Sequence, residues 1–175
     1  IPQHTNVYYE GTIEDWCNII FIASEYYHHG EMNKDSIHFY LRNSNDEWEE
    51  VTSIEIPDTI TEIGLAQFFN FSNITSIIIS ESVTSIEYYA FSNCSSLTSI
   101  TIPDSVTTID YCTFSNCNSL TDVYYEGRKK DWNNINIDDL GNSDLTAATI
   151  YYYSETKPTE EGDYWHYVDG IVTKW

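Results

Sequence analysis

The most numerous ionisable side chains of the chain are carboxylates, but their spacing does not predict an active site. Glycoside hydrolysis needs two carboxylates across a cleft. Acidic residues such as Glu62, Glu87 and Asp110 instead lie in turns of a repeated segment and are expected to be exposed to solvent. The sequence has no nucleophile elbow, phosphate loop or HExxH motif. We therefore expect a protein that is not an enzyme, with an acidic-residue glycosidase as the catalytic alternative.

Histidine and cysteine give equally little sign of a metal centre. His28, His29 and Glu31 share a polar loop that would bind a divalent cation only weakly, because no second ligand cluster accompanies them. The four cysteines form no CxxC pair and no Cys-His cluster with zinc spacing. We expect neither a metal nor a cofactor.

The cysteines at Cys94 and Cys117 stand at equivalent positions of neighbouring repeats. Adjacent strands lie about 5 Å apart, which is near disulfide range, but parallel side chains seldom reach the required torsion. Small buried thiols are the preferred interpretation, and a disulfide is the alternative.

Composition narrows the class of partner. The chain has 175 residues, 41% of them apolar, with 7 basic and 28 acidic side chains and a net charge of −21. Such a charge repels nucleic acid and anionic membrane surfaces, so neutral or cationic partners are expected. No apolar run is long enough to cross a bilayer, which predicts no membrane insertion. The first residues contain no signal peptide, although this does not exclude export.

A repeat of 23 residues organises the middle of the chain. Residues 51–73, 74–96 and 97–119 follow one pattern without insertion, and a fourth copy starts at Leu120 and then changes. Each copy opens with alternating apolar residues, which predicts a short strand with one buried face. Proline or aspartate then turns the chain, and a second apolar pair follows. Phenylalanines recur at 68, 91 and 114 and predict a continuous buried spine across stacked repeats.

Asparagines at 70, 93 and 116 form another column in the turns of the repeat. We expect them to form a hydrogen-bonded ladder to the backbone of the next coil, with ligand binding as the alternative.

A second motif brackets the array. Residues 7–19 and 123–135 share the pattern VYYEG followed by Asp-Trp and Asn, at an offset of 116 residues. Each copy predicts a strand, a glycine turn and a short helical segment in which Trp16 or Trp132 anchors the core, with stacking on a ligand as the alternative role of the tryptophans. Beyond the copies, residues 37–41 and 48–54 predict a hairpin, 149–154 a strand, and the tail a hairpin turning at Asp169-Gly170.

The 23-residue unit, "LTSITIPxSVTTIxxxxFxxCxSL", resembles the BspA-like (Treponema pallidum-type) leucine-rich repeat over residues 51–125. The VYYEG insert and the ending "YYYSETKPTEEGDYWHYVDGIVTKW" resemble modules that accompany such repeats in surface proteins of gut bacteria. The resemblance implies a secreted or cell-surface, horseshoe-like solenoid used for adhesion or for host or glycan interaction, without a catalytic site. The resemblance assigns no binding residue to this sequence.

The expected fold is therefore a leucine-rich-repeat solenoid, right-handed and curved, with a strand and a short helical or irregular segment per repeat. It is of mixed α/β class with hairpin insertions. We expect one continuous domain with an N-terminal module at 1–50, three repeats and the start of a fourth at 51–122, and a C-terminal module and hairpin tail at 123–175.

The side chains between the buried strand positions give the candidate binding face. They are Tyr8, Ser53, Glu55, Ser76, Ile78, Ser99, Thr101, Asp122 and Tyr124. We expect this face to bind a host or microbial surface protein or a glycan. The alternatives are a solvated sheet without a tight ligand and a structural spacer that displays another domain of a larger surface protein.

Overall fold

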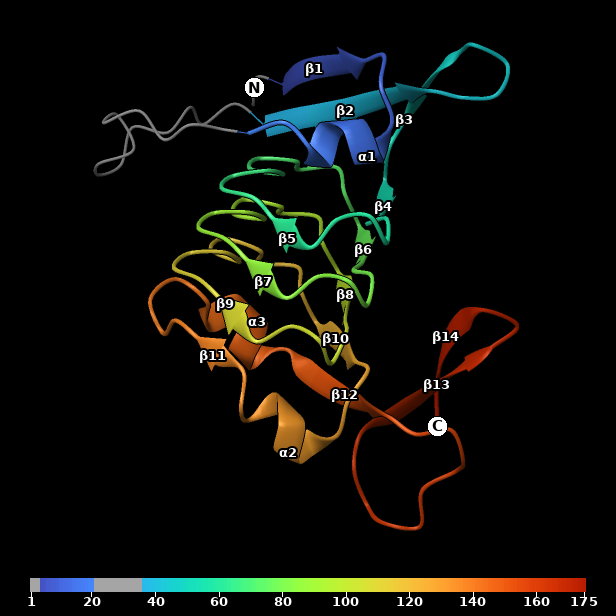
Figure 1. Ribbon diagram of the computed structural model, residues 1–175, viewed down its shortest axis with the longest axis vertical. Coiled ribbons are helices and arrows are strands. Elements are labelled where there is room, and N and C mark those ends of the chain that lie inside the picture. The colour runs from blue at the N-terminus through green and yellow to red at the C-terminus, as the bar shows by residue number, and fades with distance from the viewer. Residues whose placement is uncertain (1–3, 21–35) are drawn as a thin grey trace.

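Parallel strands spaced one repeat apart form the main sheet of the protein. The computed structural model describes residues 4–20 and 36–175, and Figure 1 shows the repeats as coils stacked along the long axis. The sheet has seven strands in the order β14-β13-β12-β10-β8-β6-β4. They are β4 (Ser53–Glu55), β6 (Ser76–Ile78), β8 (Ser99–Ile102), β10 (Asp122–Tyr125), β12 (Thr149–Tyr153), β13 (Tyr164–Val168) and β14 (Ile171–Lys174).

The register of this sheet follows the sequence repeat. Ser53 pairs with Ser76, and Ser76 pairs with Ser99, so each strand meets the strand 23 residues later. Thr75 and Thr98 each donate a hydroxyl hydrogen bond, 2.9 Å long, to the backbone carbonyl of the threonine one repeat earlier. The predicted strand at the start of each repeat is confirmed.

A second parallel sheet, which the sequence did not predict, runs along another side of the stack. Its strands are β5 (Glu62–Ile63), β7 (Ser85–Ile86), β9 (Thr108–Ile109) and β11 (Asn136–Ile137). Each strand has only two residues, so no alternation long enough to indicate a strand exists in the sequence. The second apolar pair of each repeat ends in this sheet.

The core is a set of columns that cross the repeats. Ile54, Ile77 and Ile100 are buried in register, and the rings of Phe68 and Phe91 stack with centroids 5.5 Å apart. Phe114 continues the aromatic column at 5.4 Å from Phe91. Because each ring is covered by its neighbours, one coil alone would leave this apolar surface exposed. The predicted spine is confirmed.

The asparagine column forms a ladder, and the bonds that join its members run from side chain to side chain and not from side chain to backbone as expected. The amide of Asn93 donates to Asn70 Oδ1, and the amide of Asn116 donates to Asn93 Oδ1, both at 2.7 Å. All three residues have left-handed backbone conformations, with φ between 59° and 64°. Asparagine tolerates this conformation better than other side-chain-bearing residues, which explains the residue type in the turn.

The two copies of the VYYEG motif fold alike. Strand β1 (His4–Tyr9) leads to helix α1 (Ile13–Cys17), and β10 leads to helix α2 (Lys129–Trp132). In both copies the second tyrosine of the motif meets the tryptophan edge to face, with centroids 5.2 Å apart. Trp16 and Trp132 pack against the core, which confirms the predicted anchors. A short helix, α3 (Ser143–Ala147), buries Leu145 before β12.

The predicted hairpins are present, but residues 48–54 do not form one strand: they divide between a strand at Trp48–Glu50 and β4 of the seven-stranded sheet. Strand β2 (Ser36–Arg42) pairs antiparallel with β3 (Trp48–Glu50), and β13 pairs with β14. Asp169 and Gly170 both have positive φ, as the tight turn between β13 and β14 requires. Strands β1, β2 and β3 form a sheet separate from the seven-stranded sheet.

Candidate functional site

The strand face carries five of the expected site residues in an open row. Ser53 and Glu55 are exposed on β4, Ser76 and Ile78 follow on β6, and Ser99 follows on β8. Ile78 is 38% exposed although its strand neighbour Ile77 is buried. The side chains of this part of the face are mostly small and polar, and they surround one exposed isoleucine.

Thr101 was expected on the same face and is instead buried. Its side chain is only 3% exposed, and in register it stands between Ile78 and Tyr124. Two larger side chains therefore flank a small one, and the threonine is covered. The prediction that Thr101 is available to a ligand is wrong.

The tail hairpin covers the C-terminal part of the face, which the sequence did not predict. Trp165 is fully buried, donates its indole N–H to the carbonyl of Tyr125 at 3.0 Å, and meets the Tyr124 ring at 5.6 Å. Lys174 Nζ lies 2.8 Å from Asp122 Oδ1 and 4.2 Å from the centroid of Tyr151. Asp122 and Tyr124 are thus engaged by the chain's own tail.

The charge states in this covered region follow from the contacts. Partial burial lowers the pKa of Lys174, but hydrogen bonds to Asp122 and Tyr151 outweigh it and hold the pKa above its usual value. Burial, and secondly the Asp122 carboxylate, raise the pKa of Tyr124. At neutral pH the tail therefore contributes an ammonium group that lies between the Asp122 carboxylate and the rings of Tyr124 and Tyr151.

Tyr8 lies apart from this face, on the sheet of β1, β2 and β3. It is 51% exposed and stacks on Tyr40 with centroids 4.8 Å apart. Trp48 meets Tyr8 edge to face with ring centroids 5.2 Å apart, and the Arg42 guanidinium lies 4.5 Å from the centroid of the Trp48 ring. The expected tyrosine at the N-terminal end is therefore part of an exposed aromatic cluster, Tyr8, Tyr40 and Trp48.

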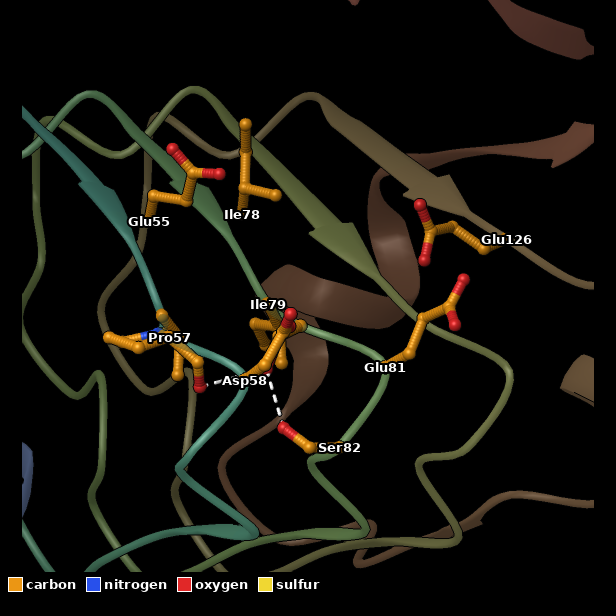
Figure 2. Close-up of a pocket in the computed structure, with 10 residues that line it drawn as sticks. Glu55, Pro57, Asp58, Ile78, Ile79, Glu81, Ser82 and Glu126 are labelled. Carbon is orange, nitrogen blue, oxygen red and sulfur yellow. Dashed lines mark hydrogen bonds between the residues drawn. The ribbon is translucent and has the colours of Figure 1, made fainter. Parts of the chain in front are cut away.

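An acidic groove of about 720 Å³ adjoins the open part of the strand face. Figure 2 shows Glu55 and Ile78 at one end of it and the carboxylates of Glu81 and Glu126 next to each other at another. Asp58 also lines the groove. Glu81 and Glu126 could not be predicted as site residues, because nothing in the repeat pattern places them together.

Glu126 is held by the tail at the edge of this groove. Its Oε1 accepts a hydrogen bond from the Tyr167 hydroxyl at 2.9 Å. Burial raises the pKa of Glu126, the neighbouring Glu81 adds to this, and the Tyr167 bond opposes it. Burial also raises the pKa of Tyr167, so this tyrosine is a neutral donor at physiological pH. The groove presents negative charge and hydroxyl groups, which suit a cationic or hydroxyl-rich partner.

Metal and redox chemistry find no support in the part of the chain that the structure describes. No group of three or more His, Cys, Asp or Glu side chains there is arranged to hold a metal ion. His28, His29 and Glu31 lie outside the described residues. Cys94 and Cys117 are free thiols, each donating to a backbone carbonyl at 3.2 Å, so the preferred interpretation of buried thiols holds. Among residues 4–20 and 36–175, no helix is long and apolar enough to cross a membrane.

Comparisons with known proteins place the repeat in a family. No curated protein matches the chain. Among solved structures, a leucine-rich cell surface protein from Faecalibacterium prausnitzii is 20% identical, with a TM-score of 0.32. The match covers 60% of this chain and 45% of that structure. The BspA type leucine rich repeat region matches residues 44–156 in six copies, which is more than half of the chain. The chain therefore belongs to the family of proteins with BspA-type leucine-rich repeats.

Proposed function

We propose that the chain is a non-catalytic binding module at the cell surface or in secreted form, which recognises a protein or glycan through the open part of its strand face. The binding residues are Ser53, Glu55, Ser76, Ile78 and Ser99. Under this proposal the stacked coils form a right-handed, curved solenoid with the face on its inner side. The repeat family supports a surface location and a protein-binding role.

The observation that carries the proposal is the exposure of Ile78. It stands on a strand whose register is fixed on both sides, next to the exposed Glu55 on β4, and both side chains line the acidic groove. An apolar side chain with charged and hydroxyl groups around it has the composition of a small recognition site, with an apolar centre and a polar rim. The rigid parallel ladder keeps that site preformed.

The test is a binding screen of the full chain against immobilised glycans and extracellular-matrix proteins. Binding of one ligand class is expected, and Ile78→Arg is expected to weaken it by about tenfold or more, as loss of a central contact does. Ile171→Arg is the matched control, because Ile171 is 69% exposed on β14 and is not part of the open row. Absence of binding at high micromolar concentration would overturn the proposal and favour the structural spacer.

A further inference from the structure

The duplicated module builds the same pair of stacked tyrosines twice. In the C-terminal copy Tyr124 and Tyr151 are in register and stack at 5.4 Å with an interplanar angle of 27°. In the N-terminal copy Tyr8 and Tyr40 are in register and stack at 4.8 Å and 26°. Tyr8 and Tyr124 are equivalent by the 116-residue offset of the motif, and Tyr40 and Tyr151 are equivalent by their parallel pairing with them.

Each pair also meets a tryptophan from an antiparallel hairpin. Trp165 approaches Tyr124 edge to face at 5.6 Å and 63°, and Trp48 approaches Tyr8 at 5.2 Å and 67°. Each tryptophan faces a cation across its hairpin, since Trp165 pairs with Lys174 and Trp48 pairs with Arg42. The two aromatic clusters therefore share a stacked tyrosine pair and an edge-on tryptophan, but the cation stands on the strand of Tyr40 in the N-terminal copy and on the far hairpin strand, β14, in the C-terminal copy.

The copies differ in where the cation lies. In the C-terminal copy the Lys174 ammonium lies over the Tyr151 ring, 4.2 Å from its centroid, and near Tyr124 at 5.8 Å. In the N-terminal copy Arg42 lies over Trp48 and pairs with Asp46 at 3.2 Å. Over the described residues, no cation lies over Tyr8 or Tyr40.

The two clusters also differ in exposure, because the cluster without a cation over its tyrosines is the more exposed one. Trp165 is fully buried, whereas Trp48 is 36% and Tyr8 51% exposed. Tyrosine, tryptophan and arginine are the residue types that most often dominate binding energy at interfaces. The N-terminal cluster thus presents to solvent a surface that the C-terminal copy uses to hold its own tail.

We infer that Tyr8, Tyr40 and Trp48 form a docking site for a lysine or arginine side chain carried on an extended segment of a partner protein, as the equivalent tyrosines hold Lys174. Cations bind favourably over aromatic faces. Glu50, opposite Tyr40 on β3, supplies negative charge beside the site, and the net charge of −21 attracts a basic segment. The inference rests on the proposed binding function and names the chemistry of its partner.

Titration of the full chain with hexalysine amide at physiological ionic strength, followed by calorimetry, tests the inference. Saturable binding is expected, and Tyr8→Leu and Trp48→Leu should each weaken it by about fivefold or more, as loss of a cation–aromatic contact does. Tyr88→Leu is the matched control, because Tyr88 is 47% exposed in a turn of the array. Hexalysine amide acetylated on its side chains and its N-terminus should not bind, since it lacks the charge.

Three outcomes would overturn the inference. They are absence of hexalysine binding, equal binding of the acetylated peptide, and binding that Tyr8→Leu leaves unchanged while Glu81→Gln weakens it. In the last case the acidic groove, and not the aromatic cluster, holds the cation. If hexalysine does not bind while a screened ligand still binds and Ile78→Arg weakens that binding, the inference is wrong and the proposed function stands. If hexalysine binds through Tyr8 while the screen finds no ligand, the proposed function of the strand face falls.

Discussion

The ring of Tyr125 lies so close over Gly127 that a Cβ on that glycine would stand 2.6 Å from ring atom Cε1. The same relationship recurs between Tyr9 and Gly11, also at 2.6 Å. The glycine of the VYYEG motif is therefore required by the tyrosine two residues before it, and the motif is a packing unit. The difference between the copies is burial, because Tyr125 is fully buried whereas Tyr9 is partly exposed.

Gly127→Ala is expected to lower the free energy of unfolding by about 1–3 kcal/mol, the usual cost of overpacking a rigid site. Gly11→Ala should lower the free energy of unfolding by less, because the partly exposed Tyr9 ring has room to move. Denaturant unfolding of both variants measures the difference. Adding Tyr125→Leu to Gly127→Ala should recover part of the loss, and strictly additive effects of the two changes would contradict the packing explanation.

The asparagine ladder should be most sensitive at its middle position. Asn93 both accepts from Asn116 and donates to Asn70, whereas Asn116 only donates within the ladder. Glycine keeps the left-handed backbone, so Asn93→Gly should remove two side-chain hydrogen bonds at about 1 kcal/mol each, and Asn116→Gly should remove one. Thermal unfolding measures both variants. Equal losses at the two positions would show that the ladder does not contribute in this way.

The array could be predicted because its buried side chains recur at a fixed spacing. Ile54, Ile77 and Ile100 occupy the same position of each repeat, so the strand, its inward face and the columns of the core followed from the sequence. The two-residue strands of the second sheet were missed because so short a segment has no visible period.

The covered part of the face could not be predicted, because its contacts join residues far apart that belong to no repeat. The tail reaches back from Trp165 to the carbonyl of Tyr125 and from Lys174 to Asp122, over 40 and 52 residues. Thr101 was placed correctly on its strand, but its burial depends on the size of its neighbours across the sheet. Strand alternation predicts which way a side chain points, not what covers it.

Three of the four thiols should resist modification in the folded state. Burial raises the pKa of Cys17 and of Cys117 to about 12 and raises that of Cys94 as well, so little reactive thiolate forms at pH 8. A thiol reagent should therefore modify the buried Cys94 and Cys117 only as fast as the protein unfolds, and the partly exposed Cys17 slowly, because little of its thiolate forms. Cys112 is partly exposed and should give the single fast phase.

The kinetics of that reaction, followed in the wild type and in Cys112→Ala, measure this. The variant should lose the fast phase and keep the slow ones. Fast modification of Cys94 or Cys117 under native conditions, or a mass that shows a disulfide between them, would contradict the structure.

Glu126 should make the protein less stable as the pH rises. Its pKa in the folded state lies above the unfolded value, mainly because of burial, so the folded chain binds more protons than the unfolded chain between the two pKa values. The free energy of unfolding contributed by this group is therefore highest below the unfolded pKa and falls as the pH rises through the folded pKa.

Glutamine at position 126 keeps the oxygen that accepts from Tyr167 and removes the charge. Glu126→Gln should thus unfold at a higher temperature than the wild type at pH 7, with the difference shrinking toward pH 4. Glu155→Gln, in the exposed loop after β12, is the charge-matched control, and an identical stabilisation by both variants would assign the effect to net charge instead of to the burial of Glu126.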